Sequence, residues 1–118
     1  MLPISANTDR MNKTERSYAN HLENLRLAGE LMDWQFEPVG LRLSENKCYY
    51  HPDFLVLYED HFEVHETKAF NKKQGKPLVK DDALVKIKVA ASQFYFLKFK
   101  IVWWDSIQHK WDNRVLSS

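Results

Sequence analysis

Residues 51–68 read HPDFLVLYEDHFEVHETK, two apolar runs separated by a short polar interval. The runs at 54–58 and 62–66 are rich in β-branched and aromatic residues, which are typical of strands. Between them, residues 59–61 are short and polar enough to form a turn. The stretch therefore predicts a β-hairpin that folds about Asp60.

Charged side chains gather at the open end of this hairpin. Residues that face each other across it have numbers that sum to about 120, so Asp53 is expected opposite Thr67 or Lys68. Alternation along a strand puts Glu66 and Lys68 on one face, which is otherwise apolar. Buried charges are costly unless they are paired or bind a metal, and carboxylates suit magnesium. Two explanations stay open: a divalent-metal site, or an ion pair between Glu66 and Lys68 at the rim of the hairpin.

The composition is that of a globular protein with one core. The chain has 118 residues, of which 44% are hydrophobic, and we expect one domain over 1–118 with a loose leader over 1–11 and a tail of unassigned structure over 105–118. The single cysteine, Cys48, excludes an internal disulfide and is expected to be a small buried hydrophobe. No signal peptide and no apolar run near the ~20 residues that span a bilayer is visible. We therefore expect a soluble cytoplasmic protein with no membrane partner.

Helices are predicted on both sides of the hairpin. Residues 12–28 carry apolar side chains at helical spacing, and Gly29 is a plausible C-terminal stop. A second helix is predicted over 81–95, where a pair of aspartates begins another helical pattern.

Two further segments resemble strands. Residues 34–43 predict a strand that is interrupted or edged by Pro38, and residues 99–104 predict another. Residues 71–80 are expected to form a polar loop beside the candidate site. The order of elements predicts an α/β (α+β) fold, a mixed β-sheet flanked by helices.

The net charge of +1 does not indicate a nucleic-acid binder, but the basic residues are unevenly placed. Lysines cluster within one short window, namely Lys68, Lys72, Lys73, Lys76, Lys80, Lys86 and Lys88. The window is either a local phosphate-binding surface or a solvated lysine-rich loop.

The element order and these charged residues together resemble the PD-(D/E)XK nuclease superfamily. Pro52-Asp53 matches the PD of that family, and Glu66-Thr67-Lys68 matches its (D/E)XK. Within the superfamily, the run at 50–55 and the aspartate pair that opens the second helix are similar to Holliday-junction resolvases of the phage endonuclease I type and to small phage proteins. The resemblance covers about residues 12–104 and implies a restriction-endonuclease-like core. The chain differs from those resolvases at Ala69, where glycine is usual.

This resemblance implies a metal-dependent endodeoxyribonuclease. Asp53 and Glu66 would bind Mg²⁺ or Mn²⁺ together with the backbone carbonyl of Thr67. Lys68 would position the attacking water or stabilise the negative charge that builds on the phosphate.

The family also has an acidic residue on its first helix that reaches the metal, and Glu15 fits that position. Helical spacing puts Glu15 on the same face as Tyr18 and Leu22. However, Asn12 and Glu15 also have the spacing of a capping box, in which Glu15 bonds back to the backbone of Asn12. Glu15 is therefore a predicted catalytic and metal-binding residue with a competing role as a helix cap.

The remaining candidates are contacts to DNA. Lys86 and Lys88 on the second helix are expected near the scissile phosphate, as the resemblance implies. His51 flanks the site and could touch the substrate or be merely structural. Weaker candidates for backbone contacts lie in the polar loop: Lys72, Lys73 and Lys76.

The substrate expected from the resemblance is branched DNA of the Holliday-junction type, in DNA recombination. A junction enzyme must cut two strands, so a homodimer is the expected assembly. A phage-encoded enzyme of this kind would act in the cytoplasm of the host cell. Two alternatives stay open: a nuclease on linear or nicked duplex DNA, and a non-catalytic DNA-binding protein that retains the nuclease fold.

Overall fold

The structure is a computed structural model that describes residues 10–43 and 48–116. Within them the chain forms helices α2 (Lys13–Leu27) and α3 (Asp81–Gln93). The strands are β1 (Asp33–Phe36), β2 (Leu41–Arg42), β3 (Tyr49–Tyr50), β4 (Phe54–Leu57), β5 (Phe62–Thr67), β6 (Phe70–Asn71), β7 (Lys76–Pro77), β8 (Lys98–Asp105) and β9 (Lys110–Leu116).

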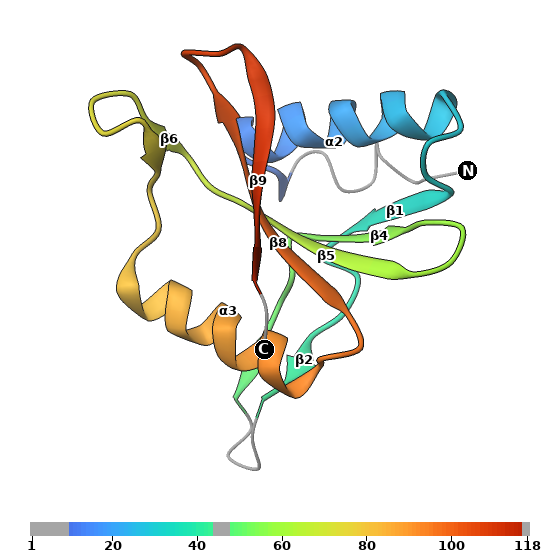
Figure 1. Cartoon of the computed structure of the whole chain (residues 1–118). Coiled ribbons are helices and arrows are strands. Elements are labelled where there is room, and N and C mark those ends of the chain that lie inside the picture. The colour runs from blue at the N-terminus through green and yellow to red at the C-terminus, as the bar shows by residue number, and fades with distance from the viewer. Residues whose placement is uncertain (1–9, 44–47, 117–118) are drawn as a thin grey trace.

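A mixed five-stranded sheet is the centre of the fold (Figure 1), with strand order β1-β4-β5-β8-β9. Neighbouring strands are antiparallel except β5 and β8, which run parallel. Parallel strands need a long crossover connection, and here α3 lies within it. The predicted class, an α+β fold with a mixed sheet and helices, is confirmed.

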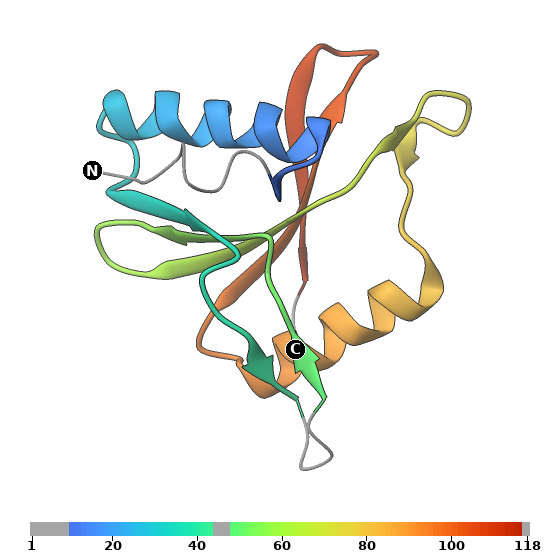
Figure 2. The same ribbon diagram turned by 180° about the vertical axis from the view of Figure 1, so that it is seen from behind.

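Each helix covers one face of this sheet, as the two opposite views show (Figures 1 and 2). The apolar face of α2 packs on β1 and β4, in a cluster that includes Tyr18, Leu22, Trp34, Phe54 and Val56. The apolar face of α3 packs on β5 and β8, in a second cluster that includes Val64, Ile87, Ala90, Phe99 and Ile101. Alternation along the central strands supplies both clusters, so each face of the sheet is buried.

The predicted hairpin is β4–β5, closed by a hydrogen bond from the Tyr58 amide to the His61 carbonyl (2.8 Å). Its register differs slightly from the expected one, because Phe54 pairs with His65. Continuing that register places Asp53 beside Glu66 rather than opposite Thr67 or Lys68. The turn is therefore one residue tighter than a fold about Asp60 requires.

Both predicted helices are present. Asn12 is the N-cap of α2, which ends one residue before the predicted limit. α3 begins at Asp81 as predicted but ends at Gln93, and Lys80 occupies its N-cap without a side-chain hydrogen bond.

The segment predicted as one strand over 34–43 is divided in the structure. Glu37 adopts a positive φ of 45°, and Pro38 follows it, so the chain leaves the sheet there. The first part, β1, pairs with β4, whereas β2 pairs with β3 in a separate two-stranded sheet.

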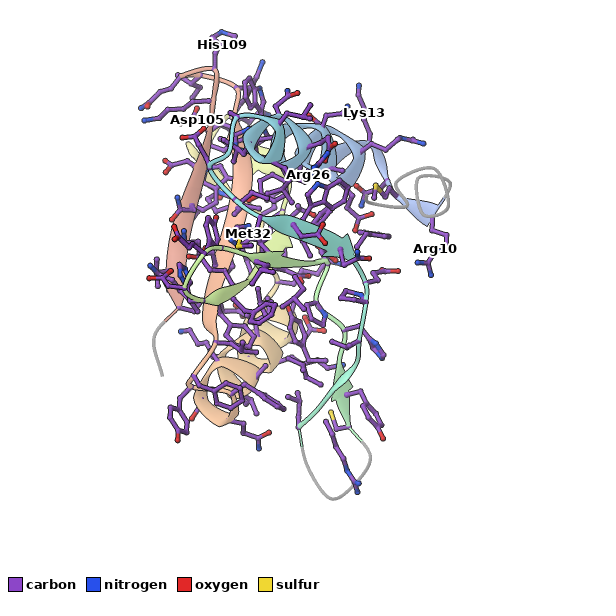
Figure 3. The ribbon with its side chains drawn as sticks, turned by 90° about the vertical axis from the view of Figure 1, so that its right-hand side faces the viewer. Arg10, Lys13, Arg26, Met32, Asp105 and His109 are labelled. Atoms are coloured by element: carbon purple, nitrogen blue, oxygen red, sulfur yellow. The ribbon has the colours of Figure 1, made fainter. Side chains whose placement is uncertain are left out.

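The tail left unassigned over 105–118 contains β9, which pairs with β8 along its whole length. The connection is an Asx-type turn, in which Asp105 Oδ1 accepts hydrogen bonds from the amides of Ile107 and Gln108 (both 2.9 Å). His109 stands at the tip of this β8–β9 ribbon (Figure 3) and has a positive φ of 55°.

Other expectations concern the leader, the loop and the cysteine. Most of the leader, residues 1–9, lies outside the described residues, and Met11 is buried. The loop at 71–80 contains the short β6–β7 hairpin. Cys48 is exposed, so its expected burial was wrong. In the part of the chain that the structure describes, no helix is long and apolar enough to cross a membrane.

Candidate metal centre

The structure brings Asp53 and Glu66 together at the open end of the β4–β5 hairpin. Asp53 directly precedes β4, and Glu66 is the penultimate residue of β5. Thr67 fixes the Asp53 carboxylate, because its amide (2.9 Å) and its hydroxyl (3.0 Å) both donate to Oδ2. Thr67 thus leaves Oδ1 for a different partner.

The Glu66 carboxylate is held by its own set of donors. The Tyr50 hydroxyl donates to Oε1 (2.6 Å), and Lys68 Nζ lies 3.5 Å from Oε2. The side chain of Glu66 is only 13% exposed, so these donors replace most of its hydration.

The electrostatics of this pair favour a cation. Burial, and then the neighbouring charge of Glu66, raise the pKa of Asp53 to about 7. Burial also raises the pKa of Glu66, although the Tyr50 hydroxyl and Lys68 oppose the rise. Two carboxylates that share one site cannot both ionise easily without a compensating positive charge. One ammonium group does not balance them, so a divalent ion would be stabilised here.

The available donors fit magnesium or manganese. Asp53 and Glu66 offer hard oxygen atoms, and a magnesium ion commonly takes only one or two protein carboxylates and keeps several waters. The amide of Thr67 points toward Asp53, and in a strand the carbonyl of the same residue points to the same side. The predicted carbonyl ligand is thus on the correct side of β5.

A larger cluster of ligands is absent from the described residues, where no group of three or more His, Cys, Asp or Glu side chains could hold a metal ion. Glu15, the predicted third carboxylate, forms the alternative capping box instead. Its side chain accepts from the Asn12 amide (2.8 Å), and the Asn12 side chain accepts from the Glu15 amide (2.8 Å). Glu15 is nevertheless near enough for its charge to contribute to the raised pKa of Asp53. Its role as a ligand stays a prediction.

The predicted DNA contacts are exposed on two other elements of the fold. Lys86 and Lys88 are exposed on α3 and flank the buried Ile87. Lys72 and Lys73 are exposed in the turn between β6 and β7.

His51 is exposed and packs against the backbone of Gly40, where an added Cβ would lie 2.7 Å from the imidazole. Its ring also stacks on Tyr49, with 6.3 Å between the ring centroids. These contacts indicate that His51 is held by the β2–β3 sheet.

A second set of buried charges lies on the opposite face of β5, and the sequence did not indicate it. Glu63, with a side chain 4% exposed, accepts from Nε2 of His61 (2.7 Å), Nε2 of His65 (2.8 Å) and Nζ of Lys100 (3.0 Å). The Tyr18 hydroxyl completes the network through Nδ1 of His65 (2.6 Å). Burial alone would raise the pKa of Glu63, but the hydrogen bonds from these donors lower it to about 2.

Sequence reasoning also missed Tyr50 and the side chain of Thr67 as groups that position the two carboxylates. The signal for Thr67 was present, because a hydroxyl inside a Glu-x-Lys motif next to an aspartate can donate to it. Tyr50 had no comparable signal, since its direction depends on the separate β2–β3 sheet.

No family model, curated protein or solved structure matches this chain.

Proposed function

We propose that this chain is a metal-dependent endodeoxyribonuclease of the PD-(D/E)XK type, which hydrolyses phosphodiester bonds of DNA. The observation that carries the proposal is the pair of buried carboxylates, Asp53 and Glu66, with Lys68 beside them at one end of a hairpin. The order α2, β4–β5, α3, β8 also agrees with the restriction-endonuclease-like core of that superfamily.

The residues divide the work in a way that follows from their contacts. Asp53, Glu66 and the Thr67 carbonyl would hold Mg²⁺ or Mn²⁺, which when bound polarises a phosphoryl oxygen and lowers the pKa of a water. Thr67 and Tyr50 hold the two carboxylates in place through hydrogen bonds. Hydrogen bonds from neighbouring groups to the residues that bind a metal keep those residues oriented and raise the affinity for the metal.

Lys68 supplies the positive charge that the chain itself offers to the reacting phosphate. Its amide donates to the carbonyl of Val102 (2.9 Å), which anchors the backbone to β8. Its ammonium group lies beside Glu66 and can turn toward a phosphate oxygen on which negative charge builds.

Branched DNA is the proposed substrate and a homodimer the proposed assembly, because a junction has two strands to cut. The test compares cleavage of a four-way junction, a matched linear duplex and a nicked duplex, each with Mg²⁺ and with chelator. We expect Mg²⁺-dependent cleavage that is fastest on the junction, and a loss of at least about 100-fold in Lys68→Ala. Lys110→Ala is the matched control, because Lys110 is exposed on β9 away from the carboxylates.

Three outcomes separate the alternatives. Absence of Mg²⁺-dependent cleavage of every substrate overturns the enzyme, and DNA binding without cleavage would then identify a binding protein with a nuclease fold. Equal cleavage of junction and duplex overturns only the junction preference. Equal losses in Lys68→Ala and Lys110→Ala overturn the assignment of Lys68.

A further inference from the structure

A groove of about 480 Å³ lies between the β6–β7 hairpin, the start of α3 and the β8–β9 ribbon. The hairpin and the ribbon project in the same direction, and α3 lies below them (Figures 1 and 2). The charged or aromatic part of its lining is formed by Lys76, Trp103 and Arg114. The apolar part is formed by Leu78, Val79 and Leu84. Neither the groove nor Arg114 entered the site predicted from the sequence.

The charge of this groove fits a polyanion. Lys76 and Arg114 are its only charged lining residues in the described part of the chain, and no acidic side chain lines it. Both are exposed, and neither forms an ion pair with another described residue. Unpaired cations beside an apolar wall suit a nucleotide, which has a charged phosphate and a less polar sugar and base.

The strand register connects the groove to the candidate metal centre. Glu66 of β5 pairs with Ile101 of β8, and Ile101 pairs with Arg114 of β9. Residues paired in this way share a face of the sheet, so Glu66 and Arg114 lie on the same face, two strand spacings or about 10 Å apart. At a rise of about 3.4 Å per nucleotide, a phosphate at Arg114 is within about three nucleotides of the carboxylates.

The last pair of this register is Thr67 with Val102, and continuing it by one residue places Lys68 beside Trp103. Trp103 belongs to the wall of the groove, and its side chain faces α3 with the second core cluster. The groove therefore begins next to the lysine proposed to act on the phosphate.

The size of the groove selects the form of the nucleic acid. Its volume is within the ~300–1,000 Å³ of sites that enclose one small molecule, which is the scale of a nucleotide. A duplex is too wide to enter, since its major groove alone measures about 12 Å across. One strand separated from its complement can enter.

We propose that this groove receives an unpaired DNA strand next to the scissile phosphate, and that Arg114 and Lys76 bind its phosphates; the proposal rests on the nuclease function proposed above. The substrate is then DNA with a single-stranded segment at the cleavage point, as at a flap or at a junction whose central base pairs are open. An intact duplex does not enter the groove, so these two side chains should contribute less to its binding.

The test measures binding by fluorescence anisotropy in chelator, so that no strand is cut. The probes are a blunt duplex and the same duplex with a single-stranded extension. For the double variant Lys76→Gln, Arg114→Gln we expect affinity for the extended duplex to fall at least about tenfold. The slope of log affinity against log salt should decrease in magnitude by about 1.4 on that probe, because each lost contact to a single strand contributes about 0.7. Affinity for the blunt duplex should change much less.

The matched control is Lys98→Gln, Lys110→Gln, which removes the same charge from exposed positions of β8 and β9 outside the groove. Equal losses in both double variants, or equal losses on both probes, overturn the groove assignment. Cleavage by the unaltered protein with Mg²⁺ is measured in parallel. Its absence overturns the nuclease, whereas cleavage combined with unchanged binding by the groove variant overturns the groove proposal alone.

Discussion

Glu63 and Glu66 lie on the same strand, β5, and the side chains of both are largely withdrawn from solvent. Glu63 faces α2 among His61, His65 and Lys100, and these donors lower its pKa to about 2. Glu66 faces the other way, next to a second carboxylate, and burial raises its pKa. One strand thus carries a carboxylate whose charge the protein compensates and another that belongs to a pair of carboxylates, which the single ammonium group of Lys68 balances only in part.

The difference separates stability from ligand binding. A compensated buried charge is part of the fold, and removing it leaves its partners unpaired. An uncompensated pair destabilises the protein until something positive binds, which makes it a candidate for a functional site. The two glutamates can therefore be distinguished by which property their removal changes.

The largest effect is expected from paired substitutions of these glutamates. Glu66→Gln should reduce Mg²⁺-dependent cleavage by at least about 100-fold, with an unchanged or higher free energy of unfolding in chelator, because the repulsion with Asp53 is removed. Glu63→Gln should lower the free energy of unfolding by about 3 kcal/mol, since Lys100 and the two histidines lose their anion. Cleavage assays and urea denaturation measure both properties. A lower free energy of unfolding for Glu66→Gln than for Glu63→Gln would contradict the distinction between the two glutamates.

The second prediction concerns the pH dependence of stability in the metal-free protein. The pKa of Asp53 in the folded state is about 7, well above the ordinary value of 3.8. Between those values the unfolded chain has released a proton that the folded protein still holds, so this contribution to stability falls as pH rises from about 4 to about 7. We expect Asp53→Asn to gain stability relative to the unaltered protein over that window, and added Mg²⁺ to stabilise the unaltered protein more at pH 8 than at pH 5.

Glu63 should show the opposite dependence. Its folded pKa of about 2 lies below the ordinary 4.5, so its contribution is complete above about pH 4.5 and is lost as pH falls toward 2. The stability difference between the unaltered protein and Glu63→Gln should shrink over that range. Denaturation at a series of pH values in chelator measures both pH ranges. If the stability of Asp53→Asn and that of Glu63→Gln, each relative to the unaltered protein, changed in the same way with pH, the opposite electrostatic roles of Asp53 and Glu63 would be contradicted.

The sequence predicts the features that depend on neighbouring residues, but not those that depend on contacts between distant segments of the chain. The β4–β5 hairpin and the α2 cap could be predicted, because their apolar periods and capping residues are local. Asp53, Glu66 and Lys68 are linked by one hairpin, so their proximity followed from the same local pattern. The network around Glu63 was missed because Tyr18 and Lys100 reach it from distant elements.

The same reasoning explains the missed strand. β9 is an edge strand with most of its side chains exposed, so it lacks the alternation that marks a half-buried strand. Without β9 there was no register from which to place Arg114 on the face of Glu66. The turn that starts at Asp105 was the available signal, since an aspartate that accepts two following amides favours a reversal of the chain.

The third prediction tests whether Tyr50 supports the uncompensated carboxylate. Tyr50→Phe removes the hydroxyl that donates to Glu66 Oε1 and should weaken Mn²⁺ binding by about tenfold, measured by electron paramagnetic resonance. Tyr49→Phe is the matched control, because the neighbouring Tyr49 is exposed and stacks on His51 instead. Equal affinities in the two variants would show that the hydroxyl of Tyr50 does not orient Glu66.

The smallest effect should come from Glu15, whose two possible roles respond differently to the same pair of changes. Glu15→Gln keeps a side-chain oxygen for the Asn12 amide, so the stability of the protein should stay within about 0.5 kcal/mol, whereas Glu15→Ala should cost about 1 kcal/mol. If Glu15 acts on the metal centre only through its charge, Glu15→Gln should weaken Mn²⁺ binding by less than about fivefold. If Glu15→Gln lost as much Mn²⁺ affinity as Glu66→Gln does in the same measurement, Glu15 would instead be a direct ligand that leaves its cap when the ion binds. Glu15 would then join the uncompensated carboxylates, and the α2 cap would be one of two alternative states of the same side chain.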